Sequence, residues 1–141
     1  MNSIPDLRIL LIDDNEIDLL LHEKLILHQR ISHTVLPFTN ANKALEYLSS
    51  NITLTNIPPT IILLDIQMPE MDGFEFLQSF NTYPPRIKSQ CYVIMVSSSL
   101  DYSDINRSNA NPMVMKLLRK PLMIKELTET INEIFREQDG D

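Results

Sequence analysis

Five apolar runs recur along the chain, and each consists mainly of aliphatic or β-branched residues. They are Arg8–Ile12, Thr34–Phe38, Thr60–Asp65, Tyr92–Val96 and Val114–Leu118. An apolar run of this length without polar alternation is typical of a strand that is buried on both faces, as in a parallel sheet covered by helices. The pattern predicts five strands, of which Thr34–Phe38 is the weakest and Thr60–Asp65 the central one. The residues predicted to turn the chain after this central strand are Pro69, Asp72 and Gly73.

Helical spacing of apolar residues marks the segments between these runs. The first helix is expected to extend to about Arg30, with its apolar residues at Ile17, Leu20, Leu21 and Leu25. The apolar positions of the later helices are Ala44, Leu45 and Leu48; Phe74 and Leu77; Tyr102, Ile105 and Ala110; and Ile124, Leu127, Ile131 and Ile134. The third helix must end before Pro84. The helix over Asp101–Asn111 should be marginal, because Asn and Ser dominate it.

Strands that alternate with helices predict βαβ units, whose right-handed crossovers build a parallel sheet with helices on both faces. We therefore expect an α/β fold: a doubly wound, five-stranded parallel sheet with five helices and the flavodoxin-like strand order 2-1-3-4-5. The chain has 141 residues, of which 43% are hydrophobic and 22% charged, and no Gly/Ser-rich or low-complexity stretch marks a linker. A single domain, 1–141, is the expected organisation.

The charge, the apolar runs and the cysteine content of the chain argue against several classes of partner and location. Its formal net charge is −7, whereas a nucleic-acid surface needs clustered Lys and Arg, so no nucleic-acid partner is expected. No leader opens the chain and no apolar run approaches the length of a membrane span, which argues against a membrane partner. Cys91 is the only cysteine and excludes an intrachain disulfide, so a reducing, cytoplasmic location is expected.

Carboxylates stand at the ends of two of the predicted strands. In the order 2-1-3-4-5, the strand order reverses between the first and third strands, and this places Asp13 and Asp14 beside Asp65. Three carboxylates a few ångströms apart repel one another, so they stay ionised together only around a cation. Oxygen ligands of this kind suit Mg²⁺, which commonly joins protein carboxylates to phosphate. Ser97 and Lys120 end the neighbouring strands on the same edge and are suitable partners for a phosphoryl group.

Each of these residues also has a more ordinary interpretation. A single Asp at a strand end is usually a turn former or a helix cap, Lys120 alone would be a solvated lysine, and Ser97–Ser99 would be a polar turn. Their joint occurrence favours a site. The histidines at 22, 28 and 33 lack the i, i+4 spacing of metal ligands and are interpreted as surface or satisfied side chains. The apolar stripe of the last helix is interpreted as core, with the seam of a weak homodimer as the alternative.

Four signals stand in order along the chain, each at a strand end. They are the Asp13-Asp14 pair, LLDIQMPEMDG around Asp65, Ser97 after VIMV, and the Lys120-Pro121 pair. Together they resemble the receiver domain of two-component response regulators, of the stand-alone, chemotaxis-regulator-like kind. The resemblance covers essentially the entire chain, from about Leu7 to Phe135.

The resemblance implies a role for each member of the acidic cluster. Asp65 would be the phosphoacceptor, and Mg²⁺ would be the cofactor. Asp14, Asp65 and the backbone carbonyl of Gln67 would bind this ion directly. Asp13 would act largely through metal-bound water.

The resemblance also implies how the phosphoryl group is held. Ser97 would be the switch hydroxyl, and Ser98 would be the small residue beside it. Lys120 would pair with the phosphoryl charge. Pro121 would follow a cis peptide bond, which proline alone readily permits.

The chain departs from the family pattern on its signalling surface. Leu117 occupies the switch-aromatic position, where the family commonly has Tyr or Phe, and Met113-Val114 replaces the usual small Gly-Ala pair. Leucine has a smaller body and no hydroxyl, so its two environments should differ less in free energy than those of an aromatic. We therefore expect Leu117 to contribute little to activation. The movement on activation should occur mainly in Ser97–Ser99 and in Asp101–Asn111.

By this resemblance the chain is a phosphoacceptor signalling domain of a two-component phosphorelay, and not an enzyme beyond slow self-catalysed phosphorylation and dephosphorylation. A histidine kinase or a histidine phosphotransfer protein would phosphorylate Asp65, and the product would hand the phosphate on or change the binding of a downstream protein. The alternative is a receiver-like interaction module that binds partners without phosphate. A metal-dependent phosphatase is disfavoured, because no second strong acid follows immediately after Asp65.

Overall fold

The five strands form one sheet in which all neighbours are parallel. A computed structural model describes residues 4–138 of the chain. Its strands are β1 (Arg8–Ile12), β2 (Thr34–Phe38), β3 (Thr60–Asp65), β4 (Cys91–Ser97) and β5 (Val114–Arg119). They lie in the order β2-β1-β3-β4-β5, which confirms the predicted doubly wound sheet. β4 and β5 extend slightly beyond the predicted runs, because Cys91, Ser97 and Arg119 continue the pairing with neighbouring strands.

Residues 4–138 contain six α-helices and one 3₁₀ turn in addition to the strands. The helices are α1 (Glu16–His28), α2 (Ala41–Ser49), α3 (Gly73–Phe80), α4 (Pro85–Lys88), α5 (Tyr102–Ala110) and α6 (Ile124–Gln138), and the 3₁₀ turn is Ser50–Thr53.

α4 adds one short helix to the five predicted: Pro85 stands in its first turn, where a missing N–H has no helical partner to lose, and Ile87 is buried. α1 ends earlier than predicted, and Arg30 beyond it has a φ of 56°, a left-handed value that no α-helix continues. None of these described helices is long and apolar enough to cross a membrane.

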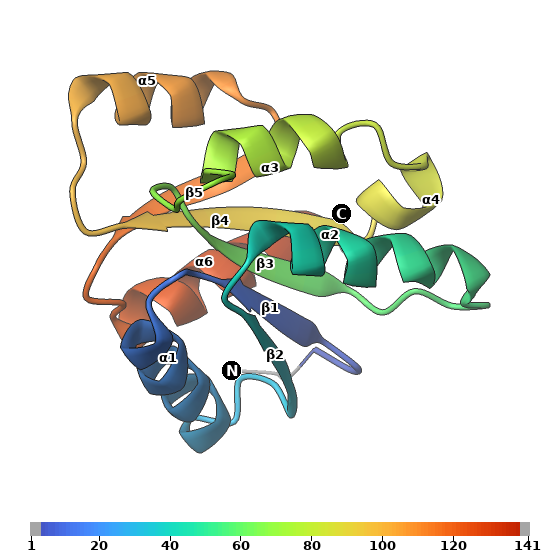
Figure 1. Cartoon of the computed structure of the whole chain (residues 1–141). Coiled ribbons are helices and arrows are strands. Elements are labelled where there is room, and N and C mark those ends of the chain that lie inside the picture. The colour runs from blue at the N-terminus through green and yellow to red at the C-terminus, as the bar shows by residue number, and fades with distance from the viewer. Residues whose placement is uncertain (1–3, 139–141) are drawn as a thin grey trace.

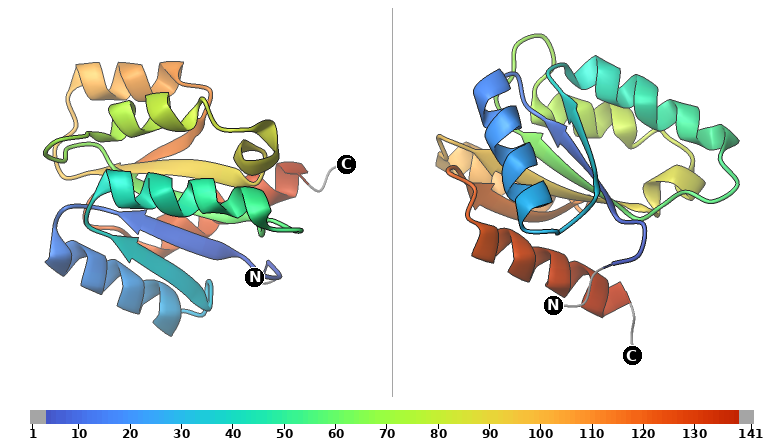
Figure 2. Two further views of the ribbon diagram at one scale, coloured as in Figure 1. Left: turned by 45° about the vertical axis from the view of Figure 1, so that its right-hand side comes forward. Right: turned by 90° about the horizontal axis from the view of Figure 1, so that it is seen from below.

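Helices cover both faces of the sheet (Figure 1). α1 and α6 lie on one face and α2, α3, α4 and α5 on the other, and the two further views agree (Figure 2). Each face of the sheet packs in its own hydrophobic core, and the side chains of β1 alternate between the two. Leu10 and Ile12 pack with α2 and α3, whereas Ile9 and Leu11 pack with α1 and α6. Every residue of β1 and β3 is buried, as their unbroken apolar runs predict.

α1 buries only a small part of its apolar surface against the sheet. Leu19 and Ile26 are its buried residues, whereas Ile17, Leu20 and Leu21 are 69%, 51% and 58% exposed. Leucine and isoleucine occupy nearly every side of this helix, so the spacing of apolar residues does not select one face. The predicted helix is therefore present, but of its four predicted apolar positions only Leu25 packs against the core, and contacts with the rest of the fold set the rotation of the helix.

The turn between β3 and α3 folds tightly onto the end of β3. The N–H of Gly73 donates to the carbonyl of Ile66 at 2.8 Å, and a Cβ at position 73 would lie only 2.7 Å from the carbonyl oxygen of Asp65. Glycine alone fits so close to another backbone. Asp72 caps α3 in a capping box with Glu75. The predicted turn is therefore present, and it fixes the backbone that follows Asp65.

Candidate functional site

The carboxyl ends of four strands meet at one edge of the sheet. Asp13 directly follows β1, Asp65 ends β3, Ser97 ends β4, and Lys120 directly follows β5. Parallel strands bring their carboxyl ends to the same edge, so these side chains converge even though 107 positions separate Lys120 from Asp13. The structure thus brings the predicted strand-end residues into one place.

Three carboxylates cluster at this edge. One oxygen from each of Asp13, Asp14 and Asp65 lies within 4.8 Å of the others. Asp13 and Asp65 are buried, whereas Asp14 is exposed. They border a hollow of about 360 Å³ that is also lined by Asn15, Asp18, Gln67, Ser98 and Lys120. This spacing and chemistry suit the coordination of one small divalent cation by oxygen.

The carboxyl group of Asp65 lies in an unfavourable place for a negative charge. Burial, followed by the charge of Asp13, raises its pKa from 3.8 to about 7, although Lys120 acts in the opposite direction. The positive charge of Lys120 alone therefore does not offset the negative charge of the carboxylate cluster. A cation among the carboxylates would favour the ionised form of Asp65, and this set of oxygen donors is one that Mg²⁺ accepts.

Lys120 is bound on the α1 side of the cluster. Its Nζ donates to Asp13 Oδ2 at 2.6 Å and to Asp18 Oδ2 at 2.9 Å, and it lies 3.8 Å from Asp65 Oδ2. Burial favours the neutral amine, but hydrogen bonds to Asp13 and Asp18 prevail and raise the pKa of Lys120 to about 12. The lysine therefore stays charged and is closer to these two acids than to Asp65. The peptide bond between Lys120 and Pro121 is cis.

Asp18 is a site residue that the sequence patterns did not mark. It lies in the first turn of α1, and its N–H donates to the capping side chain of Asn15 at 3.1 Å. An acid in the first turn of a helix is ordinarily explained by the helix dipole alone. The sequence feature that could have identified Asp18 as a site residue is its position one helical turn after Asp14. Its partner Lys120 is 102 positions away, so the fold alone reveals the contact.

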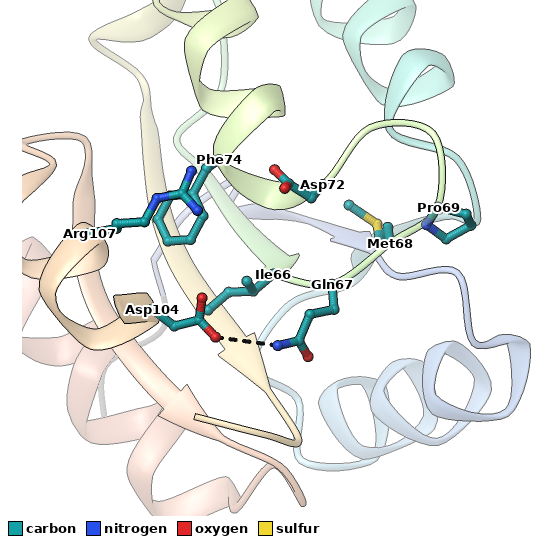
Figure 3. A pocket seen from close by; sticks show the side chains of 8 residues that line it. All are labelled: Ile66, Gln67, Met68, Pro69, Asp72, Phe74, Asp104 and Arg107. Atoms are coloured by element: carbon teal, nitrogen blue, oxygen red, sulfur yellow. Dashed lines mark hydrogen bonds between the residues drawn. The ribbon is translucent and has the colours of Figure 1, made fainter. Parts of the chain in front are cut away.

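The hydroxyl side of the site is built around the side chains of Ser97 and Gln67. Ser97 is fully buried, and its Oγ donates to the Ser99 carbonyl at 2.9 Å and to Gln67 Oε1 at 3.3 Å. Nε2 of Gln67 donates to the Ser99 carbonyl at 3.3 Å. It also donates to Asp104 Oδ2 at 3.3 Å (Figure 3). The Ser97 hydroxyl thus bonds within its own turn and to Gln67, while Ser98 lines the hollow beside Asp65.

Polar residues anchor α5 to the rest of the molecule. Its buried residues are Asp104 and Ser108, whereas Tyr102, predicted as an apolar contact, is 84% exposed. Arg107 stacks on Phe74, with its Cζ 4.0 Å from the ring centroid, and both line a cavity of about 420 Å³ (Figure 3). Polar side chains can be buried here because an amide from the β3–α3 turn satisfies the buried carboxylate of Asp104.

Leu117, at the predicted switch-aromatic position, lies on β5 and pairs with Met95 of β4. It is partly buried and packs against the apolar cluster that includes residues of α2 and α3. Its side chain carries no polar atom, so beyond the backbone pairing of β5 with β4 it contacts its surroundings only by packing.

Residues 9–132 of the chain match a family model described as the response regulator receiver domain. The chain is 30% identical over 130 residues to the probable methanogenesis regulatory protein FilR2 of Methanothrix harundinacea, and this match covers 89% of the chain and 79% of that protein. It is also 30% identical over 123 residues to the response regulator receiver protein CpdR of Brucella abortus, with coverage of 87% and 91%.

A solved structure shares the same fold over nearly its whole length. The crystal structure of a response regulator receiver protein from Dyadobacter fermentans has a TM-score of 0.84 and 36% sequence identity. The match covers 92% of this chain and 98% of that one. Residues 9–132, which match the family model, include the carboxyl ends of all four strands that contribute to the site.

Proposed function

The chain belongs to the response regulator receiver domain family, and from this premise we propose that it is the phosphoacceptor of a two-component phosphorelay, phosphorylated on Asp65. The observation that carries the proposal is the joint placement of three carboxylates within 4.8 Å and of the Lys120 amine 3.8 Å from Asp65. Phosphoryl transfer passes through a loose transition state, so a site mainly has to position the acceptor and offset negative charge. This edge of the sheet offers groups for both tasks.

Mg²⁺ is the cofactor that the acidic cluster fits, and when bound it would offset the charge of the phosphoryl oxygens. Asp14, Asp65 and the backbone carbonyl of Gln67 would hold it directly, with Asp13 acting through water. Two contacts support this division. Asp13 Oδ1 accepts from the N–H of Asn15 at 2.9 Å, and Asp13 Oδ2 accepts from Lys120 at 2.6 Å. The exposed carboxylate of Asp14 has no such partner among residues 4–138, so its oxygens are free for a metal.

In the proposed reaction, a carboxylate oxygen of Asp65 attacks the phosphorus of a phosphohistidine on the donor protein. The O–P bond of an acyl phosphate forms as the P–N bond breaks, and the electron pair stays on the histidine nitrogen. Lys120 offsets the charge of the transferred group, and the Ser97 hydroxyl turns from the Ser99 carbonyl to donate to a phosphoryl oxygen. The product carries about −2 of charge at Asp65, which is the signal to be read.

Receiver domains act with histidine kinases and with downstream effectors. We propose that the donor here is a histidine kinase or a histidine phosphotransfer protein, and that the phosphorylated form hands the phosphate on or binds a downstream protein. The exposed apolar side chains of α1 support a protein partner, since Ile17, Leu20 and Leu21 lie on the helix that also carries Asp18. Their exposure costs solubility unless a partner uses them.

Phosphate uptake from a small acyl phosphate in the presence of Mg²⁺ tests the proposal. Intact-mass analysis should show one added phosphoryl group on the wild-type chain and none on Asp65→Asn. Asp72→Asn is the matched control, because asparagine caps a helix as well as aspartate and this residue should not affect uptake.

The alternative, a receiver-like module that binds partners without phosphate, makes the opposite prediction. A folded wild-type chain that takes up no phosphate would support that alternative. Uptake by Asp65→Asn at the wild-type level would remove Asp65 as the acceptor.

A further inference from the structure

Asp18 joins helix α1 to the edge of the sheet where Asp65 lies. Its Oδ2 accepts from Lys120 Nζ at 2.9 Å, and both side chains line the hollow beside Asp65. The Lys120 side chain is 11% exposed and that of Asp18 is 29% exposed, so water screens this contact only in part. The lysine that would meet the phosphoryl group is thus held from the side by a residue of α1.

We propose that Asp18 is a positioning residue: it competes with a phosphoryl group on Asp65 for the Lys120 amine. Phosphorylation of Asp65 therefore changes the contacts of the first turn of α1. The inference rests on the proposed function, because it assumes that a phosphoryl group reaches Asp65. It adds a regulatory role for Asp18 in that same site.

The distances show how the lysine is shared. Nζ lies within hydrogen-bond distance of Asp13 and Asp18 but is 3.8 Å from Asp65, so its bonds are made to the α1 side of the cluster. A phosphoryl group on Asp65 adds negative charge opposite Asp18 and draws Nζ toward it. Asp18 then loses part of its contact, and the cost of that loss reduces the affinity of the site for the phosphoryl group.

α1 is suited to respond at low cost. Leu19 and Ile26 are the buried residues of the helix, and Leu19 alone buries an apolar side chain next to Asp18. A segment with few buried apolar contacts can shift at a small cost in free energy. The exposed Ile17 and Leu21 flank this turn, so a change in the Asp18 contact alters a surface that a partner can reach.

Amide NMR of the full chain with Mg²⁺ and the phosphoryl mimic beryllofluoride tests this inference in wild type and Asp18→Asn. Asp18→Asn should bind the mimic roughly three- to tenfold more tightly, because one nearby negative charge is gone. The mimic-induced shifts of residues 16–21, present in wild type, should be lost in this variant. A purely structural role would instead weaken binding, so the direction of the change separates the two.

Two control variants sharpen the result. Glu16→Gln removes another exposed acid from the same first turn and should bind the mimic as wild type does. Asp18→Glu keeps the charge and should restore affinity toward the wild-type value. Wild-type affinity in Asp18→Asn, or unchanged α1 shifts in that variant, would overturn the role of Asp18 while leaving phosphorylation of Asp65 intact. Failure of the wild-type site to bind the mimic would overturn the proposed function, and this inference with it.

Discussion

The site has a charged half and a hydroxyl half, and different contacts hold them. In the charged half, Lys120 meets Asp13 and Asp18 at 2.6 and 2.9 Å. In the hydroxyl half, the Gln67 amide meets Ser97 and Asp104 at 3.3 Å, near the long end of the hydrogen-bond range. Hydrogen bonds to a charged group are about twice as strong as neutral ones. The Lys120 bonds join two charged groups at short distance, whereas the Gln67–Ser97 bond is neutral and the Gln67–Asp104 bond, although it goes to a carboxylate, is long. The charged half is therefore the more firmly held of the two.

This difference separates two tasks. A site that receives a phosphoryl group needs its acceptor and cation in place beforehand, because reorganising charges during the reaction raises the barrier. A site that reports the event needs bonds that exchange readily. Under the proposed function, the charged half would meet the first need, and the hydroxyl half, whose Gln67 is exposed to water, would meet the second. Four variants or conditions test the division, in order of expected effect.

Lys120→Met should have the largest effect on stability. It leaves the carboxylates of Asp13, Asp18 and Asp65 without their shared cation, and removing one partner from a buried charge cluster costs about 3 kcal/mol. Urea unfolding at neutral pH measures the change, and added Mg²⁺ should recover part of it. A loss well below 1 kcal/mol would mean that solvent already screens these charges and that the charged half is not firmly held.

The pH dependence of stability without Mg²⁺ should come next. The folded-state pKa of Asp65 is about 7, against 3.8 for the free group. Between these values the folded chain keeps a proton that the unfolded chain releases, so the free energy of unfolding should fall as pH rises from 3.8 to about 7. Asp65→Asn lacks this contribution and serves as the control, and Mg²⁺ should diminish the fall. A difference between the two proteins that does not vary with pH would contradict the raised pKa.

Asp104→Ala should change stability by less than about 1 kcal/mol, because its one bond to Gln67 is long. Its effect should appear instead in the response of α5 to the phosphoryl mimic. The changes in amide chemical shift that beryllofluoride induces in Tyr102–Ala110 should become smaller. Asp104→Asn keeps an oxygen acceptor for the Gln67 amide and loses the same charge, so it should retain these shifts. Equal shifts in both variants would show that the Gln67 contact does not link the hydroxyl half to α5.

Leu117→Ala should have the smallest effect on the site. Leu117 contacts its neighbours only by packing, so the mimic-induced shifts in Ser97–Ser99 and in Asp101–Asn111 should persist in this variant. Loss of those shifts, with metal and mimic still bound, would show that Leu117 carries the coupling between the site and the α5 face.

The sequence predicted the parts of the site that lie at strand ends. An unbroken apolar run identifies a buried strand, and in a doubly wound parallel sheet all strands end at the same edge. The positions of Asp13, Asp14, Asp65 and Lys120 at those ends were therefore enough to predict that they meet. The alternation of strands and helices predicted a doubly wound parallel sheet, and the flavodoxin-like order 2-1-3-4-5 expected for it is the one observed.

The tertiary structure decided which side of each helix faces inward and which residues find partners there. Apolar residues are spread around α1 and are scarce on α5, so neither pattern selects a face, and most of the apolar positions predicted on these two helices are exposed or only partly buried. Asp18 and Asp104 became site residues only through Lys120 and Gln67, which lie 102 and 37 positions away. A local pattern records the average environment of a segment, whereas a pair of side chains meets only after the chain has folded, and this is why the acids on the helices were missed.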